Sequence, residues 1–298
     1  MINREILAKI RPWIGKEKIL ILKGSRQVGK TTLLREIEEE IKINQPEVRV
    51  AYLAADDLEN RPFFESPGAL EMYLRQRYDF PQVFVYLMID EFQVIPQAGL
   101  FLKNIFDRYK GKLQVIVSGS SSLEITKNTE YLTGRALNFV ISRVTFREYV
   151  RYKQQAKFEP VPMAHWSEIE TLYEVFADRL RLNFSEYLTY GGYPEVITAG
   201  TAAEKKIILS SIAQIYIEKD IINFLRVENV NGFNALLKIS AEQVGNMLNA
   251  HELSNTLGLS ANSVKKYLEI LVGTYVLELV RPFSNNLRVE FTKMPKVY

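Results

Sequence analysis

Apolar residues in the first half of the chain gather into five short runs, separated by amphipathic stretches. The runs are KILILKG (18–24), VRVAYLA (48–54), VFVYLMID (83–90), LQVIVSGS (113–120) and LNFVISRV (137–144). The first four are almost continuously apolar, which is typical of strands buried on both faces of a parallel sheet. Stretches 32–43, 97–109 and 122–132 have apolar residues three to four positions apart and predict helices. This alternation predicts an α/β layered fold.

The pattern changes near residue 151, where helical spacing replaces the β-type runs. Residues 153–166 carry two prolines and predict a linker. Stretches 167–188 and 202–225 predict amphipathic helices, separated by the turn GGYP at 191–194. We therefore expect a helical region to follow the sheet.

From about residue 240 the sequence predicts a compact helical group and then a hairpin. The expected helices are 240–249, 251–258 and 261–274, and the β-type runs are 275–283 and 287–298, turning at 284–286. Three helices followed by a hairpin are the layout of a winged helix. In such a domain Asn262, Lys265 and Lys266 are candidates to enter a major groove, with Arg288–Lys296 as the wing. The competing interpretation is a domain that packs on the preceding helical region and touches no DNA.

Composition excludes several classes of site. The chain has 298 residues, which favours about two domains. It has no cysteine, so disulfides, thiol nucleophiles and cysteine-ligated metals are excluded, and two histidines are too few for a histidine-rich metal site. The net charge is only +3, and the excess lies in residues 281–298, so charge argues weakly for a polyanionic partner.

The sequence also argues against a membrane protein. The longest apolar run, VFVYLMI, is far shorter than the ~18 residues that a membrane helix needs. The beginning, MINREILAKIRPW, is charged and periodic, unlike a signal peptide. The absence of cysteine fits a reducing compartment. We expect a cytoplasmic protein without membrane contact.

The strongest chemical signal is GSRQVGKT (24–31), which matches G-x-x-x-x-G-K-[ST] between a predicted strand and a predicted helix. Its glycines let backbone N–H groups wrap phosphates, and the helix N-terminus adds a favourable dipole. We expect Lys30 to reach the β- and γ-phosphates of a bound nucleotide and the Thr31 hydroxyl to bind Mg²⁺. The expected nucleotide-binding residues are Gly24, Ser25, Arg26, Gln27, Val28, Gly29, Lys30, Thr31 and Thr32, with Ser118 and Ser120 from a later strand.

Two acidic residues, Asp90 and Glu91, end the third predicted strand. Asp90 is placed to hold Mg²⁺, and Glu91 to polarise an attacking water. A water-activating glutamate fits a hydrolase better than a small-molecule kinase. The next strand ends in serines, and either Ser118 or Ser120 can sense the γ-phosphate; their spacing does not choose between them, and both can instead cap a helix.

Arg135 precedes the fifth predicted strand and is our candidate for an arginine finger or sensor, with Arg143 and Arg147 as weaker alternatives. An arginine near a turn is more commonly a surface residue. The catalytic residues that we expect are therefore Glu91, Lys30 and Arg135.

An ordered set of segments resembles a large bacterial and archaeal family of AAA-type ATPases. These segments are GSRQVGKTTLL, LMIDEFQ, VSGSSS, LTGRA, TFREY, GGYPEVI, YIEKDI and KMPKVY. Members of that family join an ATPase core to a helical lid, a winged helix and a C-terminal domain of unknown function. The resemblance implies that Lys30, Thr31, Asp90 and Glu91 form an adenine-nucleotide site, and it favours Arg135 as a functional arginine.

The sequence departs from that family at its end. In the family the segment that resembles KMPKVY continues into a restriction-endonuclease-like fold, whereas this sequence stops at Tyr298. We interpret this as a truncation, because a last strand there leaves an exposed apolar edge. The expected domains are a P-loop ATPase core of the AAA/ASCE type (1–150), an α-helical lid (151–235), and a winged helix with the start of a truncated module (236–298).

The resulting hypothesis is a Mg²⁺-dependent ATPase that switches its lid and winged helix between two arrangements. The first alternative is an ATP-gated module that binds duplex DNA through the winged helix with little turnover. The second is a phosphotransferase acting on a small molecule. A homo-oligomer or a protein partner is compatible with each of them.

Overall fold

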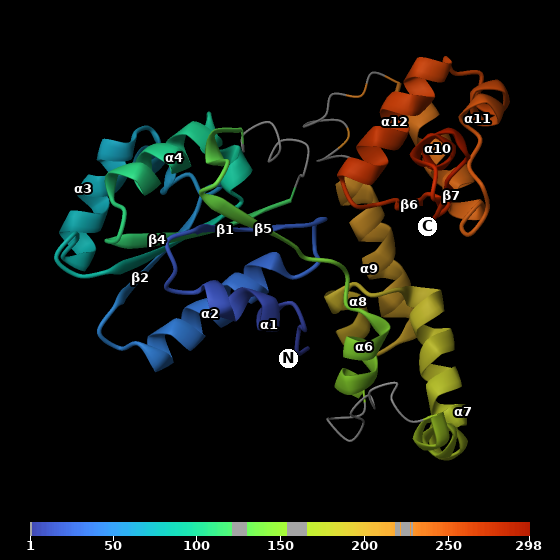
Figure 1. The fold of residues 1–298 in the computed structure, drawn as a ribbon, viewed down its shortest axis with the longest axis horizontal. Coiled ribbons are helices and arrows are strands. Elements are labelled where there is room, and N and C mark those ends of the chain that lie inside the picture. The colour runs from blue at the N-terminus through green and yellow to red at the C-terminus, as the bar shows by residue number, and fades with distance from the viewer. Residues whose placement is uncertain (1, 121–129, 154–165, 218–220, 222–226, 228) are drawn as a thin grey trace.

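The computed structural model describes residues 2–120, 130–153, 166–217, 221, 227 and 229–298 (Figure 1). At its centre lies a five-stranded parallel sheet of order β2-β3-β4-β1-β5. The strands are β1 (Ile19–Lys23), β2 (Arg49–Ala54), β3 (Val85–Asp90), β4 (Leu113–Gly119) and β5 (Ala136–Val140). The predicted α/β fold is confirmed. Because β1 lies between β4 and β5, the segments that follow these three strands meet at one edge of the sheet.

Helices cover both faces of this sheet (Figure 1). The short α1 (Leu7–Ile10) and α2 (Lys30–Asn44) lie on one face, and α3 (Pro67–Tyr78) and α4 (Ala98–Arg108) lie on the other. Successive residues of β1 alternate between the two cores, so Leu20 packs with α2 and Ile21 packs on the opposite side. This two-sided burial explains why the strand is apolar throughout. Single 3₁₀ turns complete the layer: η1 (Arg11–Trp13), η2 (Arg61–Phe64), η3 (Phe92–Val94) and η4 (Glu130–Leu132).

A helical region follows β5. It contains α6 (Phe146–Lys153), α7 (Trp166–Tyr190), α8 (Pro194–Thr198) and α9 (Ala202–Ile215). Thr201 and Glu204 form a capping box at the start of α9. An ion pair between the buried Lys205 of α9 and Glu186 of α7 joins two of these helices. The predicted helices 167–188 and 202–225 are confirmed over α7 and α9, whereas the predicted linker 153–166 and most of helix 122–132 lie outside the described residues.

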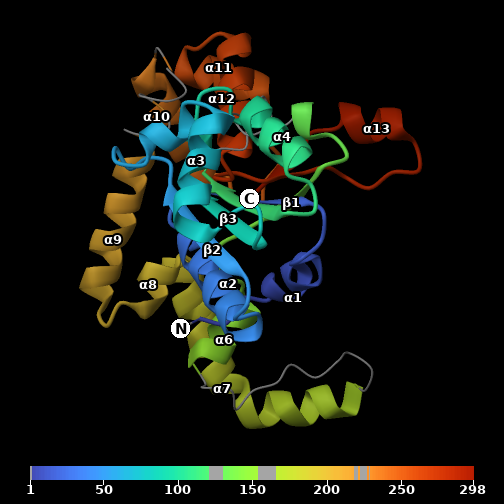
Figure 2. The same cartoon turned by 90° about the vertical axis from the view of Figure 1, so that its left-hand side faces the viewer.

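The C-terminal part is a second unit beside the sheet (Figure 1), and Figure 2 shows its last helix, α13 (Leu287–Thr292), projecting from the rest of that unit. Its elements are α10 (Val230–Glu242), α11 (Ala250–Leu257), α12 (Ala261–Gly273), β6 (Leu279–Val280), α13 (Leu287–Thr292) and β7 (Lys296–Val297). The predicted helices 251–258 and 261–274 are confirmed. The apolar residues of α12 form its core as expected: Val264, Tyr267, Leu268 and Leu271 are all buried.

Two predictions in this unit are wrong. Residues 243–249 are not helical, because α10 ends at Glu242 and Gly245 then adopts φ +85°. The expected hairpin is reduced to the antiparallel pairs Leu279–Val297 and Val280–Lys296. Between them α13 replaces a strand, and the Asn286 side chain starts this helix by accepting from the Arg288 N–H at 3.0 Å. Within the described ranges, no helix is long and apolar enough to cross a membrane.

Candidate nucleotide site

The predicted phosphate loop joins β1 to α2 at the carboxyl edge of the sheet. Gly24 packs so closely against the end of β5 that an added Cβ would lie 2.2 Å from the Ile141 carbonyl oxygen. Gly29 has φ +92°, in the left-handed region that favours glycine. Both glycines allow the backbone of the loop to curve around the N-terminus of α2. The two glycines of the motif are therefore required for different physical reasons.

Lys30 is the first residue of α2 and is buried. Its Nζ donates to the carbonyl oxygens of Gly24 at 3.1 Å and Ser25 at 2.7 Å, within the same loop. The ammonium group thus lies inside the curve of the loop, at a helix N-terminus, where anions are favoured. Of the other loop residues, Arg26 and Gln27 are partly buried, the Val28 side chain packs in the core against α2, and Thr32 is exposed.

The Asp90 carboxylate, at the end of β3, is surrounded by hydroxyl groups. The Thr31 Oγ1 donates to its Oδ2 at 2.6 Å, and the Tyr52 hydroxyl donates to the same oxygen at 3.0 Å. Ser118 of β4 donates to Oδ1. Burial, and then the nearby Asp90 charge, raise the pKa of Tyr52, which keeps the phenol protonated as a donor. The structure therefore brings together Thr31 and Asp90, the two predicted metal ligands.

This donor set fits Mg²⁺. A hydroxyl and a carboxylate are hard oxygen ligands, and Mg²⁺ typically takes only one or two protein groups beside substrate phosphates and water. Thr31 and Asp90 would hold the ion, which would supply positive charge to neutralise the phosphates of a bound nucleotide. Among the described residues, no cluster of three His, Cys, Asp or Glu side chains offers an all-protein metal cage.

Glu91 stands next to Asp90 in a strained backbone conformation, with φ +53°. A left-handed non-glycine residue costs of order 1–3 kcal/mol, and such residues cluster at functional sites. Gln93 donates from Nε2 to the Glu91 carboxylate and, at 3.1 Å, to the Ser120 Oγ. The Ser120 hydroxyl also donates to Glu91 Oε2 at 3.4 Å. Glu91 is thus held by an amide and a serine from two neighbouring elements.

The two predicted serines occupy different places. Ser118 is fully buried and bonded to Asp90, and its oxygen also accepts from the Glu91 N–H at 3.4 Å. Ser120 lies beyond the end of β4, beside Glu91 and Gln93. Ser118 therefore supports the acidic pair, whereas Ser120, which lies beside Glu91, fits the predicted sensor position better.

Arg135 does not join this cluster. It precedes β5, its backbone carbonyl accepts from the Ile19 N–H at the beginning of β1, and its guanidinium pairs with Asp107 at 2.7 Å. The strands are parallel, so Arg135 lies at the opposite edge of the sheet from the phosphate loop, about 13 Å away along β1 at ~3.3 Å per residue. Within one chain the expected catalytic arginine is not at the nucleotide site. Of the weaker candidates, Arg143 follows β5, on the side of the loop, with its guanidinium 6.0 Å from the centre of the Tyr193 ring.

Sequence reasoning missed three polar side chains that the structure adds to the site. Tyr52 and Gln93 contact the acidic pair directly, and Arg4 reaches the loop from the N-terminal segment. Gln93 had a usable signal, because it comes three positions after the end of the strand, next to the acidic pair, where a polar side chain that becomes buried needs a partner. Arg4 had none, since its partners are distant in sequence.

Comparison with known proteins agrees with this geometry. Residues 16–150 match the model of a family described as an AAA domain, and residues 181–298 match a domain of unknown function. An uncharacterized protein of Methanocaldococcus jannaschii is 25% identical over 279 residues, covering 91% of this chain and 58% of that protein. An uncharacterized protein of Haemophilus influenzae is 22% identical over 292 residues, covering 95% and 68%. The chain thus spans only part of the length of these curated relatives.

Solved structures show weaker likeness. DnaA of Aquifex aeolicus bound to AMPPCP superposes with a TM-score of 0.37 at 15% identity, over 91% of this chain and 89% of that one. Domain III of the Thermotoga maritima replication initiation protein DnaA gives 0.40 at 19% identity, over 71% and 94%. At these scores the likenesses say nothing about function. The parallel sheet and the phosphate loop after β1 give residues 16–150 a P-loop α/β fold, and the same residues are similar to a family described as an AAA domain.

Proposed function

We propose that this chain binds ATP with Mg²⁺ and hydrolyses it, and that the cycle moves its helical parts. The observation that carries the proposal is the convergence of Lys30, Thr31 and Asp90, with Glu91 beside them, at the end of β1 and β3. Two features of this arrangement cost free energy in the folded state, because Glu91 is held in a strained conformation and the Lys30 charge is buried.

Each side chain has a role that follows from its position. The loop N–H groups and Lys30 hold the β- and γ-phosphates, and Thr31 and Asp90 supply the protein oxygens for Mg²⁺. Glu91 orients and polarises the attacking water. Ser120, bonded to the same carboxylate, is our choice for the residue that senses the γ-phosphate. Tyr52 and Ser118 hold Asp90 in place.

The remaining domains are proposed from their position after the core. Residues 151–235 act as a helical lid, since α8 approaches the loop and the Pro194 ring would lie 3.7 Å from a Cβ on Gly29. Residues 236–298 are proposed as a winged helix. In support, Met247 between α10 and α11 bridges to Lys296, and β7 pairs with β6, which gives three helices and a small antiparallel sheet.

A second function has one observation in its favour. Asn262, Lys265 and Lys266 are exposed on α12 while its apolar face is buried, as a helix that enters a major groove requires. Glu269 is exposed on the same helix and weakens the positive face. An ATP-gated DNA-binding module with little turnover is therefore the alternative. A phosphotransferase is disfavoured by Glu91, which a kinase does not need at this position.

The test is phosphate release from ATP and Mg²⁺, measured for the wild type, Lys30→Ala and Glu91→Gln. Glu59→Gln, an exposed carboxylate in the loop after β2, is the matched control. We expect Lys30→Ala to lose ATP binding and Glu91→Gln to keep binding while turnover falls by ~10² or more. Turnover in Glu91→Gln equal to that in Glu59→Gln would refute the hydrolase.

The same assay with duplex DNA separates the alternative. A DNA-binding module predicts salt-dependent duplex affinity that rises with ATP and falls in Lys265→Ala/Lys266→Ala. A hydrolase that acts on a protein partner or within a homo-oligomer predicts no such dependence. Sedimentation with and without ATP then reports whether copies of the chain assemble.

A further inference from the structure

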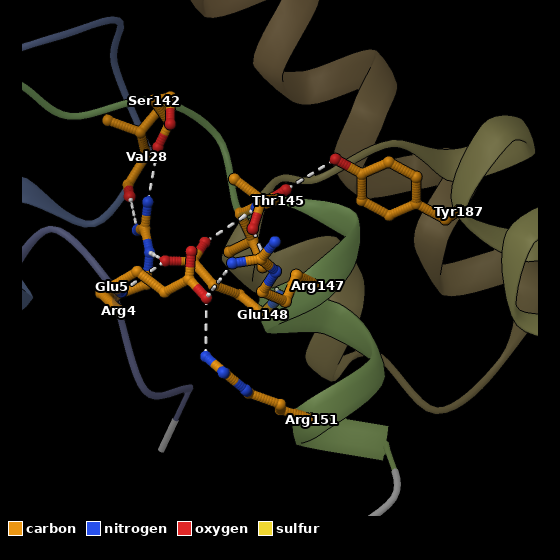
Figure 3. A network of polar contacts seen from close by, with 10 residues as sticks. Arg4, Glu5, Val28, Ser142, Thr145, Arg147, Glu148, Arg151 and Tyr187 are labelled. Carbon is orange, nitrogen blue, oxygen red and sulfur yellow. Dashed lines mark hydrogen bonds and ion pairs between the residues drawn. The ribbon is translucent and has the colours of Figure 1, made fainter. Parts of the chain in front are cut away.

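An arginine near the N-terminus reaches the phosphate loop from outside it. The Arg4 side chain is buried, and its guanidinium donates in three directions (Figure 3). One terminal nitrogen donates to the Val28 carbonyl oxygen at 2.9 Å, and the other donates to the Ser142 carbonyl oxygen at 2.7 Å. The Nε lies 3.3 Å from Glu148 Oε1. One side chain therefore joins the phosphate loop, the segment after β5 and helix α6.

Glu148 is as firmly held as Arg4. It is buried on α6, its Oε1 accepts from the Glu5 backbone N–H at 2.7 Å, and its Oε2 accepts from the Thr145 N–H at 2.8 Å. Both carboxylate oxygens are thus satisfied, and the charge is paired with a guanidinium. A buried ion pair with so many fixed partners positions what it touches, since such pairs add little net stability by themselves.

The N-terminal segment around Arg4 bridges the two parts of the molecule. Ile2 packs in a cluster with Tyr149 of α6 and Ile197 of α8, whereas Leu7 packs with α2 beneath the sheet. Arg4 therefore connects α6, through Glu148, to the Val28 peptide of the phosphate loop.

The geometry of the phosphate loop gives the Arg4–Val28 hydrogen bond its importance. A trans peptide holds its C=O and its N–H in opposite directions, so the Val28 carbonyl must point away from the phosphates if the Gly29 N–H is to point toward them. Val28 lies directly before Gly29 and Lys30, and its carbonyl is turned toward Arg4. A guanidinium bound there fixes this peptide plane before nucleotide arrives.

We infer that Arg4 is a positioning residue for nucleotide binding: it holds the Val28 peptide in the binding orientation and, through Glu148, ties that orientation to α6. The inference rests on the proposed function, because it concerns the affinity of the same site. Three donors in a planar fork are required, which arginine supplies and lysine does not.

The experiment measures the dissociation constant of a fluorescent ATP analogue with Mg²⁺, and the melting temperature without nucleotide, in the full chain. The variants are Arg4→Met, Arg4→Met/Glu148→Gln, Arg4→Lys and Lys30→Ala. The matched control is Glu5→Gln, which breaks the neighbouring ion pairs with Arg151 at 2.6 Å and Arg147 at 3.7 Å without touching the loop.

The variants should affect the melting temperature and the affinity for the ATP analogue to different extents. Arg4→Met leaves the Glu148 charge buried and unpaired, so it should lower the melting temperature. The double variant removes that charge but leaves one of the two backbone N–H groups without an acceptor, so it should recover part of the melting temperature, while the dissociation constant stays about tenfold above wild type. Arg4→Lys should keep the fold and bind with intermediate affinity, and Glu5→Gln should bind within about twofold of wild type.

The kinetic readout follows the same logic. In the double variant KM for ATP should rise about tenfold with kcat within about twofold, because the loop is mispositioned and the water-activating group is untouched. The inference is overturned if the double variant binds the ATP analogue with wild-type affinity. If the double variant does not fold, wild-type affinity in Arg4→Lys overturns it instead. Failure of the proposed function gives a different result: the wild type binds no ATP analogue, or Lys30→Ala binds it as well as the wild type does. In that case both the proposed function and the inference about Arg4 are refuted.

Discussion

The close approach of Gly24 to the end of β5 gives a sharp prediction about the phosphate loop. A Cβ at this position would lie 2.2 Å from the Ile141 carbonyl oxygen, where ordinary contact begins at 3.4 Å. Gly24→Ala therefore requires a displacement of 3.4 − 2.2 = 1.2 Å. The β5 side cannot yield freely, because the Ile141 N–H donates to the Lys23 carbonyl at 2.7 Å and ties that strand end to β1.

Two measurable costs follow from this displacement. Overpacking of this kind typically costs 1–3 kcal/mol, and each kcal/mol lowers Tm by roughly 2–4 °C in a domain of this size. If the loop moves instead of β5, its N–H groups leave the phosphate positions by about 1 Å, and we expect ATP affinity to fall by at least about tenfold. Thermal unfolding and titration with ATP and Mg²⁺ measure the two effects.

Gly68→Ala is the matched control for that substitution. Gly68 lies in the first turn of α3, and a Cβ there would meet only the Ser66 Oγ, at 3.8 Å. Alanine at such a site should stabilise the fold by about 0.4–1 kcal/mol, because the unfolded chain loses freedom. Equal melting temperatures for Gly24→Ala and Gly68→Ala would show that the close contact with Ile141 is not a constraint on the loop.

Two further predictions concern stability. The ion pair with Lys205 lowers the pKa of Glu186 to about 2, so its contribution is complete above pH ~4.5 and is lost as pH falls toward 2. Glu186→Gln should cost about 1–2 kcal/mol near pH 7, after solvent screening, and nothing near pH 2, as urea unfolding at the two pH values can show. The buried Gln114 side chain binds four backbone groups of the loop 13–18, at 2.7–3.1 Å. Gln114→Leu should therefore cost about 2–4 kcal/mol by urea unfolding, and a loss below 0.5 kcal/mol would contradict this account.

The sheet could be predicted from the sequence because its pattern is set by burial on both faces. The strand in run 83–90, for example, packs against α2 on one face of the sheet and against α4 on the other, so nearly every position in it must be apolar. The carboxyl end of β3 could be predicted for the same reason, because the apolar run stops at Asp90. Local rules sufficed wherever a whole element was buried.

Prediction failed where polar side chains, and not apolar periodicity, set the element. The run LRVEFT looks like a strand, yet Asn286 caps it as the helix α13. At residues 243–249 the apolar spacing continues, but Gly245 takes a left-handed conformation and its N–H donates to the Val297 carbonyl, 52 positions further on. Short elements bury too little surface for their pattern to decide their conformation.

At the site, the residues within each motif were predictable and the contacts between motifs were only partly so. The order of the strands placed Ser118 beside Asp90, as expected for neighbours in the sheet. Tyr52, Gln93 and Arg4 were not predicted, because their partners depend on how separate elements pack. Tertiary contacts of this kind leave no periodic trace in a single sequence.

The misplaced arginine shows that a parallel sheet carries information about which edge a residue can reach. Apart from Arg135, the residues predicted to contact phosphate, metal or water lie at the carboxyl end of a strand or in the segment that follows it, as with Thr31 after β1 and Glu91 after β3. Arg135 comes before β5, so in a parallel sheet it must begin at the opposite edge, whatever its motif suggests. Arg143 comes after the same strand and lies on the side of the loop. Within this chain, Arg143 after β5 and Arg4 from the N-terminal segment therefore lie on the side of the phosphate loop, whereas Arg135 lies at the far edge, paired with Asp107.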